Sequence, residues 1–239
     1  MTATGECHKP FRLGPLTLCH EKAAHKIGTD SVLLGAWFDT QDVVRIIDAG
    51  TGTGILALMA ALRMPGSRIT AVDISPGAVM EARANVQRNG LAERISIRQA
   101  DIRLWRPENR QDLILANPPY FENRAGSNGR TVARSGGVAF LDALFALGAE
   151  VLTPDGRVAL VWPVERRYDL LATAYGHGFS LCREMWVRDH PAANYGRMFS
   201  EWCRQAEGDL VQERLTMFRT PGGMPTEEYR QLAGKWVDL

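Results

Sequence analysis

The apolar positions of this chain fall into short, strand-like runs that alternate with segments of helical spacing. The alternation begins at Arg45, where "RIIDA" is soon followed by the mostly apolar "ILALMAALR". Short apolar runs bounded by turn residues are typical of strands that are buried on both faces of a sheet. The pattern predicts strands over residues 45–49, 68–73, 94–101, 112–117 and 157–162, and helices over residues 55–63, 75–90 and 138–152.

Turn residues mark the ends of these elements. Ser75 and Pro76 are suited to the N-cap and the first position of a helix, and Asn89 and Gly90 to its exit. A Pro-Asp-Gly turn precedes the strand predicted at 157. Strands separated by helices at this spacing predict βαβ units and a parallel sheet covered on both faces. We therefore predict an α/β fold.

The C-terminal part of the chain lacks this alternation and is richer in strands. Its strand-like runs predict antiparallel additions at one edge of the sheet, and its last amphipathic segment predicts a closing helix. These elements cover residues 179–187, 195–203, 210–218 and 225–237. Because no repeat or linker interrupts the chain, we expect a single domain over residues 1–239. Its parts are an N-terminal cap (1–44), a core (45–162) and the C-terminal strands with their helix (163–239).

Composition narrows the possible functions only a little. Apolar residues make up 45% of the chain, and the formal net charge is +1, so any nucleic-acid contact must come from local patches. The four cysteines form no CxxC pair and the five histidines are scattered, so we expect no disulfide framework, no metal site and a reducing cytosol. No signal-peptide core and no apolar stretch of about 18 residues is present, so we expect a cytoplasmic protein.

The glycine-rich stretch "DAGTGTG" at residues 48–54 follows the first predicted strand. Its three glycines permit positive φ angles and close backbone approach in a tight turn, after which the helix start offers N–H groups to a ligand. The spacing is neither the GxGxxG fingerprint nor a phosphate loop. Asp73 and Asp101 end the next two strands, so a ligand outside the carboxyl ends of the strands would meet both carboxylates.

With this turn and these carboxylates, residues 45–162 resemble a class I S-adenosylmethionine-dependent methyltransferase. The resemblance implies a Rossmann-like, mostly parallel seven-stranded sheet with helices on both faces and an antiparallel edge. It implies S-adenosyl-L-methionine as cofactor, with Gly50 to Gly54 beneath the methionine part, Asp73 at the ribose and Asp101 at the adenine. The expected cofactor-binding residues are Asp48, Ala49, Gly50, Thr51, Gly52, Gly54, Asp73, Ile74, Asp101 and Asn117.

The stretch "NPPY" leaves the fourth predicted strand beside the expected methyl group. The Asn117 side-chain oxygen and the Pro118 carbonyl can each accept an N–H from a planar nitrogen, which directs its lone pair at the methyl group. The fixed φ of two prolines holds this corner rigid, and an aromatic ring can stack on a flat substrate. The expected catalytic residues are Asn117, Pro118, Pro119 and Tyr120.

This chemistry suits several substrates: adenine N6 in DNA, base amines in RNA, and the glutamine amide of release factors. DNA enzymes usually need a large target-recognition region, whereas only about 75 residues follow the fifth strand. Release-factor enzymes carry a sizeable helical domain in front of the core, for which 44 residues are too few. Glutamine methylation, methylation of another RNA, and a non-catalytic RNA-binding relative stay open as alternatives.

The flanks of the core favour tRNA. "HEKAAHKIGTDSVLLGAW" (20–37) and the tail "PTEEYRQLAGKWV" resemble the bacterial valine-tRNA adenine-N6 methyltransferases, which modify the adenine just 3′ of the anticodon. The resemblance implies a tRNA partner, with no membrane or DNA, and we expect a monomer. "GTDSVLLGAW" is either a lid over the cofactor, with Asp30 near it, or a helix packed on the sheet. The candidate RNA-binding residues are Lys22, Lys26, Arg124, Arg130 and Arg134.

Overall fold

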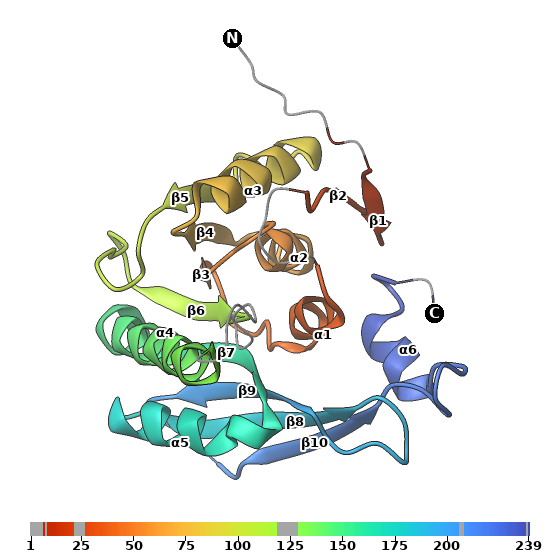
Figure 1. The fold of residues 1–239 in the computed structure, drawn as a ribbon. Helices are drawn as coiled ribbons and strands as arrows, with labels where there is room; N and C mark the ends of the chain where they lie inside the picture. Colours follow the sequence, from red (N-terminus) through yellow and green to blue (C-terminus); the bar gives the residue numbers. More distant parts are fainter. Residues whose placement is uncertain (1–6, 8, 22–26, 119–128, 206–207, 238) are drawn as a thin grey trace.

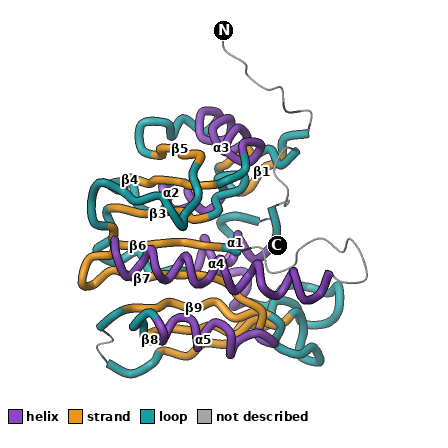
Figure 2. Tube along the Cα trace, turned by 60° about the vertical axis from the view of Figure 1, so that its left-hand side comes forward, coloured by secondary structure: helices purple, strands orange, loops and turns teal. Residues whose placement is uncertain are grey.

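A computed structural model of the chain describes residues 7, 9–21, 27–118, 129–205, 208–237 and 239, and for residues 129–136 the backbone only. Its centre is one eight-stranded sheet, whose strands run side by side across Figure 2. All neighbouring strands are parallel except β9, which is antiparallel to both of its neighbours. Across the sheet the order is β10 (Val211–Thr216), β8 (Ser180–Arg188), β9 (Arg197–Cys203), β7 (Leu152–Pro163), β6 (Gln111–Ala116), β3 (Arg45–Ala49), β4 (Arg68–Asp73) and β5 (Ile95–Gln99).

Helices cover both faces of the sheet, and each face has its own apolar core (Figure 1). Successive residues of a strand enter opposite cores, as Ile46 and Ile47 of β3 do, because side chains alternate along a strand. In the described part of the chain no helix is long and apolar enough to cross a membrane. One face carries α1 (Thr29–Trp37), α2 (Ile55–Arg63), α3 (Pro76–Arg88) and α6 (Glu227–Ala233), and the other carries α4 (Gly129–Val151) and α5 (Arg167–Gly176).

The predicted core elements are confirmed, and several have the predicted ends. β3, α2 and β4 coincide with the predicted ranges, and α3 begins after Ser75, whose hydroxyl accepts a hydrogen bond from the N–H of Ala78. Ser75 is therefore the N-cap, and Pro76 occupies the first helical position, where its missing N–H costs no hydrogen bond.

Two predictions about the sheet are wrong. The sheet has eight strands where seven were expected, and β10 is parallel to its neighbour where an antiparallel addition was expected. The reason lies in the strand order: β8 lies between β9 and β10, so β10 pairs with a strand that runs in its own direction. An apolar run identifies a strand, but it does not specify the neighbour with which that strand pairs.

Three further differences concern element boundaries. Helix α4 begins at Gly129, nine residues before the predicted start at 138. Strand β7 begins at Leu152 and includes the Pro-Asp-Gly segment, where its pairing with β6 is irregular. Helix α5 was not predicted, because only Leu170 and Ala174 of its ten residues are buried and its apolar stripe is therefore short.

The N-terminal cap contains a two-stranded hairpin of β1 (Phe11–Leu13) and β2 (Leu16–Leu18). The side-chain amide of Asn85 in α3 hydrogen-bonds to both backbone groups of Cys19, which attaches the hairpin to the core. Cys7 and Cys19 form a disulfide, which corrects the expectation of none. The hairpin brings the segments on its two sides together, with 6.1 Å between the Cα atoms, a separation that a disulfide can bridge.

Candidate active site

The candidate site lies where four adjacent strands end. Ala49 pairs with Val72 on one side and with Ala116 on the other, and Asp73 pairs with Gln99. The glycine turn, Asn117 and the segments after β4 and β5 therefore leave the sheet side by side at one edge. The strand order thus brings together the predicted residues that are far apart in the sequence.

The glycine turn has the backbone that the sequence predicts. Gly50, Gly52 and Gly54 have φ angles of 71°, 57° and 84°, in the left-handed region that favours glycine. At Gly54 an added Cβ would lie 3.3 Å from the side chain of Ala82, so the turn also packs closely against α3. At Gly52 an added Cβ would meet no atom of the described residues within 4 Å, so the middle of the turn is not covered by that part of the chain.

Asp73 links the glycine turn to the start of α3. One carboxylate oxygen accepts a hydrogen bond from the N–H of Gly52 at 2.9 Å, and the other accepts one from Ser75 at 2.9 Å. Since each carboxylate oxygen has two lone pairs, both can accept a further hydrogen bond from a ligand. Ile74, the next residue, is 62% exposed and presents an apolar side chain beside this carboxylate.

Asp48 is fully buried beneath the turn. Its Oδ2 accepts hydrogen bonds from the Thr51 hydroxyl and from the N–H of Ala57, whereas no described group hydrogen-bonds to its Oδ1. Burial raises the pKa of Asp48 to about 7, the two hydrogen bonds partly oppose this shift, and the nearby Asp73 carboxylate adds to it. The Asp48 carboxyl therefore titrates near neutral pH.

Asn117 follows β6, and its side chain meets the start of α1. Its Nδ2 donates a hydrogen bond to the hydroxyl oxygen of Ser31 at 2.8 Å. Pro118 is buried, while Pro119 and Tyr120 lie outside the described residues. The segment "GTDSVLLGAW" forms α1, and Val32 to Leu34 are buried in the core, so the interpretation as a packed helix is confirmed. The sequence analysis did not identify Ser31 as a site residue.

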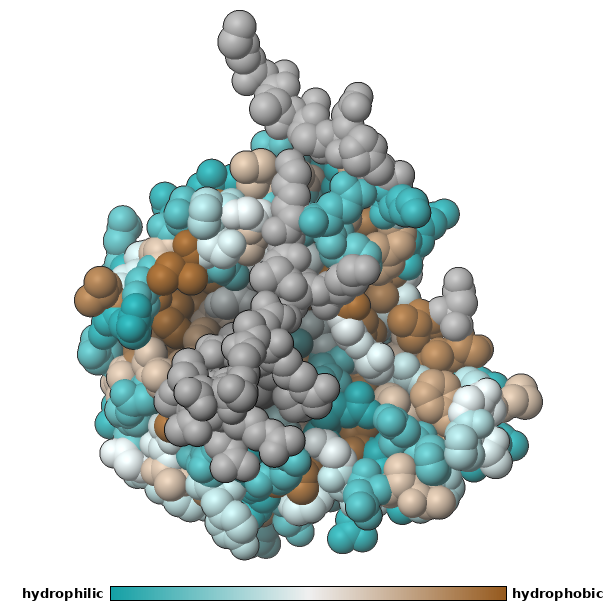
Figure 3. Space-filling model, viewed as in Figure 1, coloured by the Kyte–Doolittle hydropathy of each residue, from teal (hydrophilic) through white to brown (hydrophobic). Residues whose placement is uncertain are grey.

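Asp101 lies beyond β5 and is held by its own loop. Its carboxylate accepts hydrogen bonds from the backbone N–H and the guanidinium of Arg103, which hold the pKa of Asp101 below its ordinary value. Leu104 in the same loop is 83% exposed. Figure 3 shows apolar surface at the left, beside the loop between β5 and β6. Ile74 and Leu104 are among the exposed large apolar side chains of the described residues.

Other predicted residues lie partly beyond the described structure. Lys22, Lys26 and Arg124 lie outside it, and Arg130 and Arg134 belong to the first part of α4, of which the backbone alone is described. Phe140 of α4 is a neighbour of the site that the sequence analysis missed, because a Cβ on Gly50 would lie 3.5 Å from its ring. Within the described ranges no group of three or more potential metal ligands is present.

Comparison with known proteins agrees with this arrangement. The family model of the methyltransferase small domain matches residues 22–184, more than half of the chain. The chain belongs to this family. It is 37% identical over 211 residues to a protein of Parabacteroides distasonis named tRNA1(Val) (adenine(37)-N6)-methyltransferase, covering 87% of this chain and 89% of that one. A protein of the same name from Yersinia pestis is 35% identical over 227 residues, covering 93% and 91%.

Solved structures give the same result for the fold. A predicted O-methyltransferase from Agrobacterium tumefaciens has a TM-score of 0.70 at 18% identity, covering 87% of this chain and 96% of that one. TrmN from Thermus thermophilus has a TM-score of 0.57 at 24% identity, covering 73% and 48%. The expected class I methyltransferase fold is confirmed, with the strand count corrected to eight. The predicted resemblance to the tRNA1(Val) methyltransferase family is confirmed as well.

Proposed function

We propose that this methyltransferase transfers a methyl group from S-adenosyl-L-methionine to N6 of an adenine in tRNA, the adenine 3′ of the anticodon in a valine tRNA. One observation carries the proposal: Asn117, with its amide held by Ser31, leaves the sheet next to the glycine turn. The printed names of relatives at 35–37% identity support the same substrate. Glutamine methylation of release factors is the alternative that the test below must distinguish.

The residues at the strand ends offer chemical groups that suit S-adenosyl-L-methionine. No described residue covers Gly52, and Asp73 keeps lone pairs for the ribose hydroxyls. The Asp48 carboxyl lies buried beneath the turn, and no described group hydrogen-bonds to its Oδ1. Ile74 presents an apolar side chain against which a flat ring can pack. When bound there, S-adenosyl-L-methionine supplies an electrophilic methyl group on its sulfonium sulfur. We infer that the cofactor-binding residues are those predicted from the sequence.

Asn117 and Pro118 perform the orienting step. The Asn117 side-chain oxygen and the Pro118 carbonyl each accept one N–H of the adenine amine, so that the nitrogen lone pair points away from the ring plane. Both acceptors are fixed in advance, Asn117 by Ser31 and Pro118 by burial and its locked φ, so little reorganisation is needed during transfer. We retain Tyr120 as the residue that stacks on the base and Pro119 as the second rigid link.

A methylation assay tests the proposal. The purified protein is incubated with labelled methyl donor and one of three substrates: unmodified valine tRNA, the same tRNA with guanine at position 37, or a release factor. We expect label in the first tRNA alone, recovered after digestion as N6-methyladenosine. Label in the release factor, or equal label in the two tRNAs, would refute the assignment.

The oligomeric state, the cellular location and the RNA contacts of the protein complete the proposal. We infer that the chain acts as a single-domain monomer, because the candidate cofactor-binding residues and Asn117 lie at or just beyond the strand ends of one continuous sheet. An unpaired base of the anticodon loop can be flipped into such a site at a low free-energy cost. Because tRNA is present in the cytoplasm, we expect the protein to work there. Arg130 and Arg134 at the start of α4, together with Lys22, Lys26 and Arg124, remain the proposed RNA contacts.

A further inference from the structure

We propose that Ser31 is a positioning residue that holds the Asn117 amide with its oxygen end towards the substrate. The inference rests on the proposed function, because it concerns the same amine. An asparagine amide has an accepting oxygen at one end and a donating NH2 group at the other. An adenine amine donates its N–H groups, so it can bind only to the oxygen end. A flipped amide would present donors to donors.

The contact with Ser31 holds the amide in the orientation that an adenine amine needs. The Ser31 hydroxyl oxygen accepts the hydrogen bond from Asn117 Nδ2 at 2.8 Å, which leaves Asn117 Oδ1 at the other end of the amide. Ser31 is only 7% exposed, so water competes little for this bond. The contact joins residues that are 86 positions apart, and it depends on where α1 lies relative to the end of β6 (Figure 1).

The first turn of α1 is held in place by β9. Arg197, the first residue of that strand, donates a hydrogen bond to the carboxylate of Asp30 at 3.1 Å and forms an ion pair with it. The same guanidinium also contacts the carboxylate of Asp189. Because Asp30 directly precedes Ser31, the contact between Arg197 and Asp30 fixes the position and rotation of α1 at Ser31.

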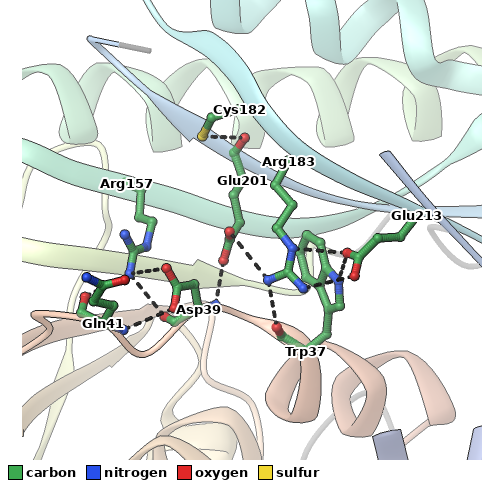
Figure 4. A network of polar contacts seen from close by, with 8 residues as sticks. All are labelled: Trp37, Asp39, Gln41, Arg157, Cys182, Arg183, Glu201 and Glu213. Atoms are coloured by element: carbon green, nitrogen blue, oxygen red, sulfur yellow. Dashed lines mark hydrogen bonds and ion pairs between the residues drawn. The ribbon is translucent and has the colours of Figure 1, made fainter. Parts of the chain in front are cut away.

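The last turn of α1 is held by contacts with β8 (Figure 4). The helix is therefore fixed at both ends. Arg183 donates to the backbone oxygen of Trp37 at 3.2 Å and stacks over its ring at 4.3 Å. The Trp37 ring nitrogen donates to Glu213 of β10 at 2.7 Å. Just beyond the helix, the N–H of Asp39 donates to Glu201 of β9 at 2.7 Å.

Between its ends, α1 packs tightly against α2. A Cβ on Gly35 would lie 2.5 Å from the Met59 sulfur, so little space separates the two helices at this point. The three C-terminal strands and α2 together leave α1 little freedom to shift. We infer that these strands serve the reaction by holding the helix that orients Asn117.

Three variants test the role of Ser31. Ser31→Ala removes the acceptor, Ser31→Thr keeps a hydroxyl, and Thr29→Ala removes an exposed hydroxyl from the same helix as a matched control. For Ser31→Ala we expect kcat to fall about 10- to 100-fold, less than the ~10²–10³-fold typical of losing a group that touches the reacting atoms. The KM for tRNA and the Kd for S-adenosyl-L-methionine should change less than about twofold. Ser31→Thr should restore most of kcat, and Thr29→Ala should match the wild type.

A double-mutant cycle shows whether Ser31 acts through Asn117. In an Asn117→Ala background, single-turnover rates with and without Ser31→Ala should agree within about twofold, because the amide to be oriented is absent. An unchanged kcat in Ser31→Ala overturns the inference. So does a loss of equal size in both backgrounds, or a loss of cofactor affinity that accounts for the effect. A wild-type protein that methylates no tRNA would refute the proposed function instead.

Discussion

The buried carboxyl of Asp48 makes the stability of the fold depend on pH. In the folded protein its pKa is about 7, against an ordinary value of 3.8, chiefly because burial disfavours the charged form. As pH rises above 3.8 the unfolded chain releases this proton while the folded chain keeps it. The stabilisation is therefore complete below 3.8 and is lost as pH rises through about 7.

The size of this loss follows from the difference in pKa. Each pH unit between the two pKa values lowers the free energy of unfolding by about 1.4 kcal/mol. Between pH 5 and pH 8 the Asp48 contribution should fall by about 2.5 kcal/mol, with the slope levelling off above pH 7. Asp48→Asn removes the titrating group and keeps an oxygen that can accept the hydrogen bonds from Thr51 and Ala57. The free energy of unfolding of this variant should therefore fall less between pH 5 and pH 8.

Urea unfolding at pH 5, 6, 7 and 8, without cofactor, measures the effect. The difference in unfolding free energy between wild type and Asp48→Asn should shift by about 2.5 kcal/mol across the range, in favour of the variant at high pH. Asp155→Asn removes an exposed carboxylate and controls for the loss of one surface charge. Parallel pH profiles for wild type and Asp48→Asn would show that Asp48 is ionised in the folded protein and would refute the reasoning.

Four other substitutions have defined outcomes. Asn117→Ala should lower methylation at least about 100-fold, while cofactor affinity by calorimetry falls much less; lost binding with retained turnover would reverse its role. Gly54→Ala should lower the free energy of unfolding by about 1–3 kcal/mol, because it combines a positive φ with a close approach to α3. Gly52→Ala, with space around it, should cost less, so equal thermal shifts would contradict this account. Arg183→Met should lower the free energy of unfolding in urea by about 2 kcal/mol, because it leaves Glu201 of β9 and Glu213 of β10 without this ion-pair partner. An unchanged urea midpoint would show that these ion pairs do not stabilise the fold.

The core could be predicted from the sequence because its signals are local. A β-branched run, a glycine turn or the pair Ser75–Pro76 indicates an element or its end within a few residues. The shared edge of the strand ends then follows, since parallel strands place their carboxyl ends on one side of a sheet. This rule alone predicts that the glycine turn, Asp73 and Asn117 lie together.

The missed features depend on partners that are distant in the sequence. Ser31 becomes part of the site only because α1 crosses the end of β6, and no local pattern distinguishes this serine from an ordinary helix residue. The direction of β10 depends on β8 lying next to it. Phe140 approaches the glycine turn through the packing of α4, in a segment whose periodicity indicates only a helix.

The single reversed strand, β9, has a consequence for how such a protein can change. Since β9 runs against β7 and β8, the connections after β8 and β10 emerge on the same side as the glycine turn. We expect residues 189–196 and 217–226 to vary with the acceptor more than the strand ends that hold the methyl donor. Asp189 is an exception, because it contacts Arg197. The reversal divides this edge of the sheet into a part that holds the methyl donor and a part that can meet the acceptor.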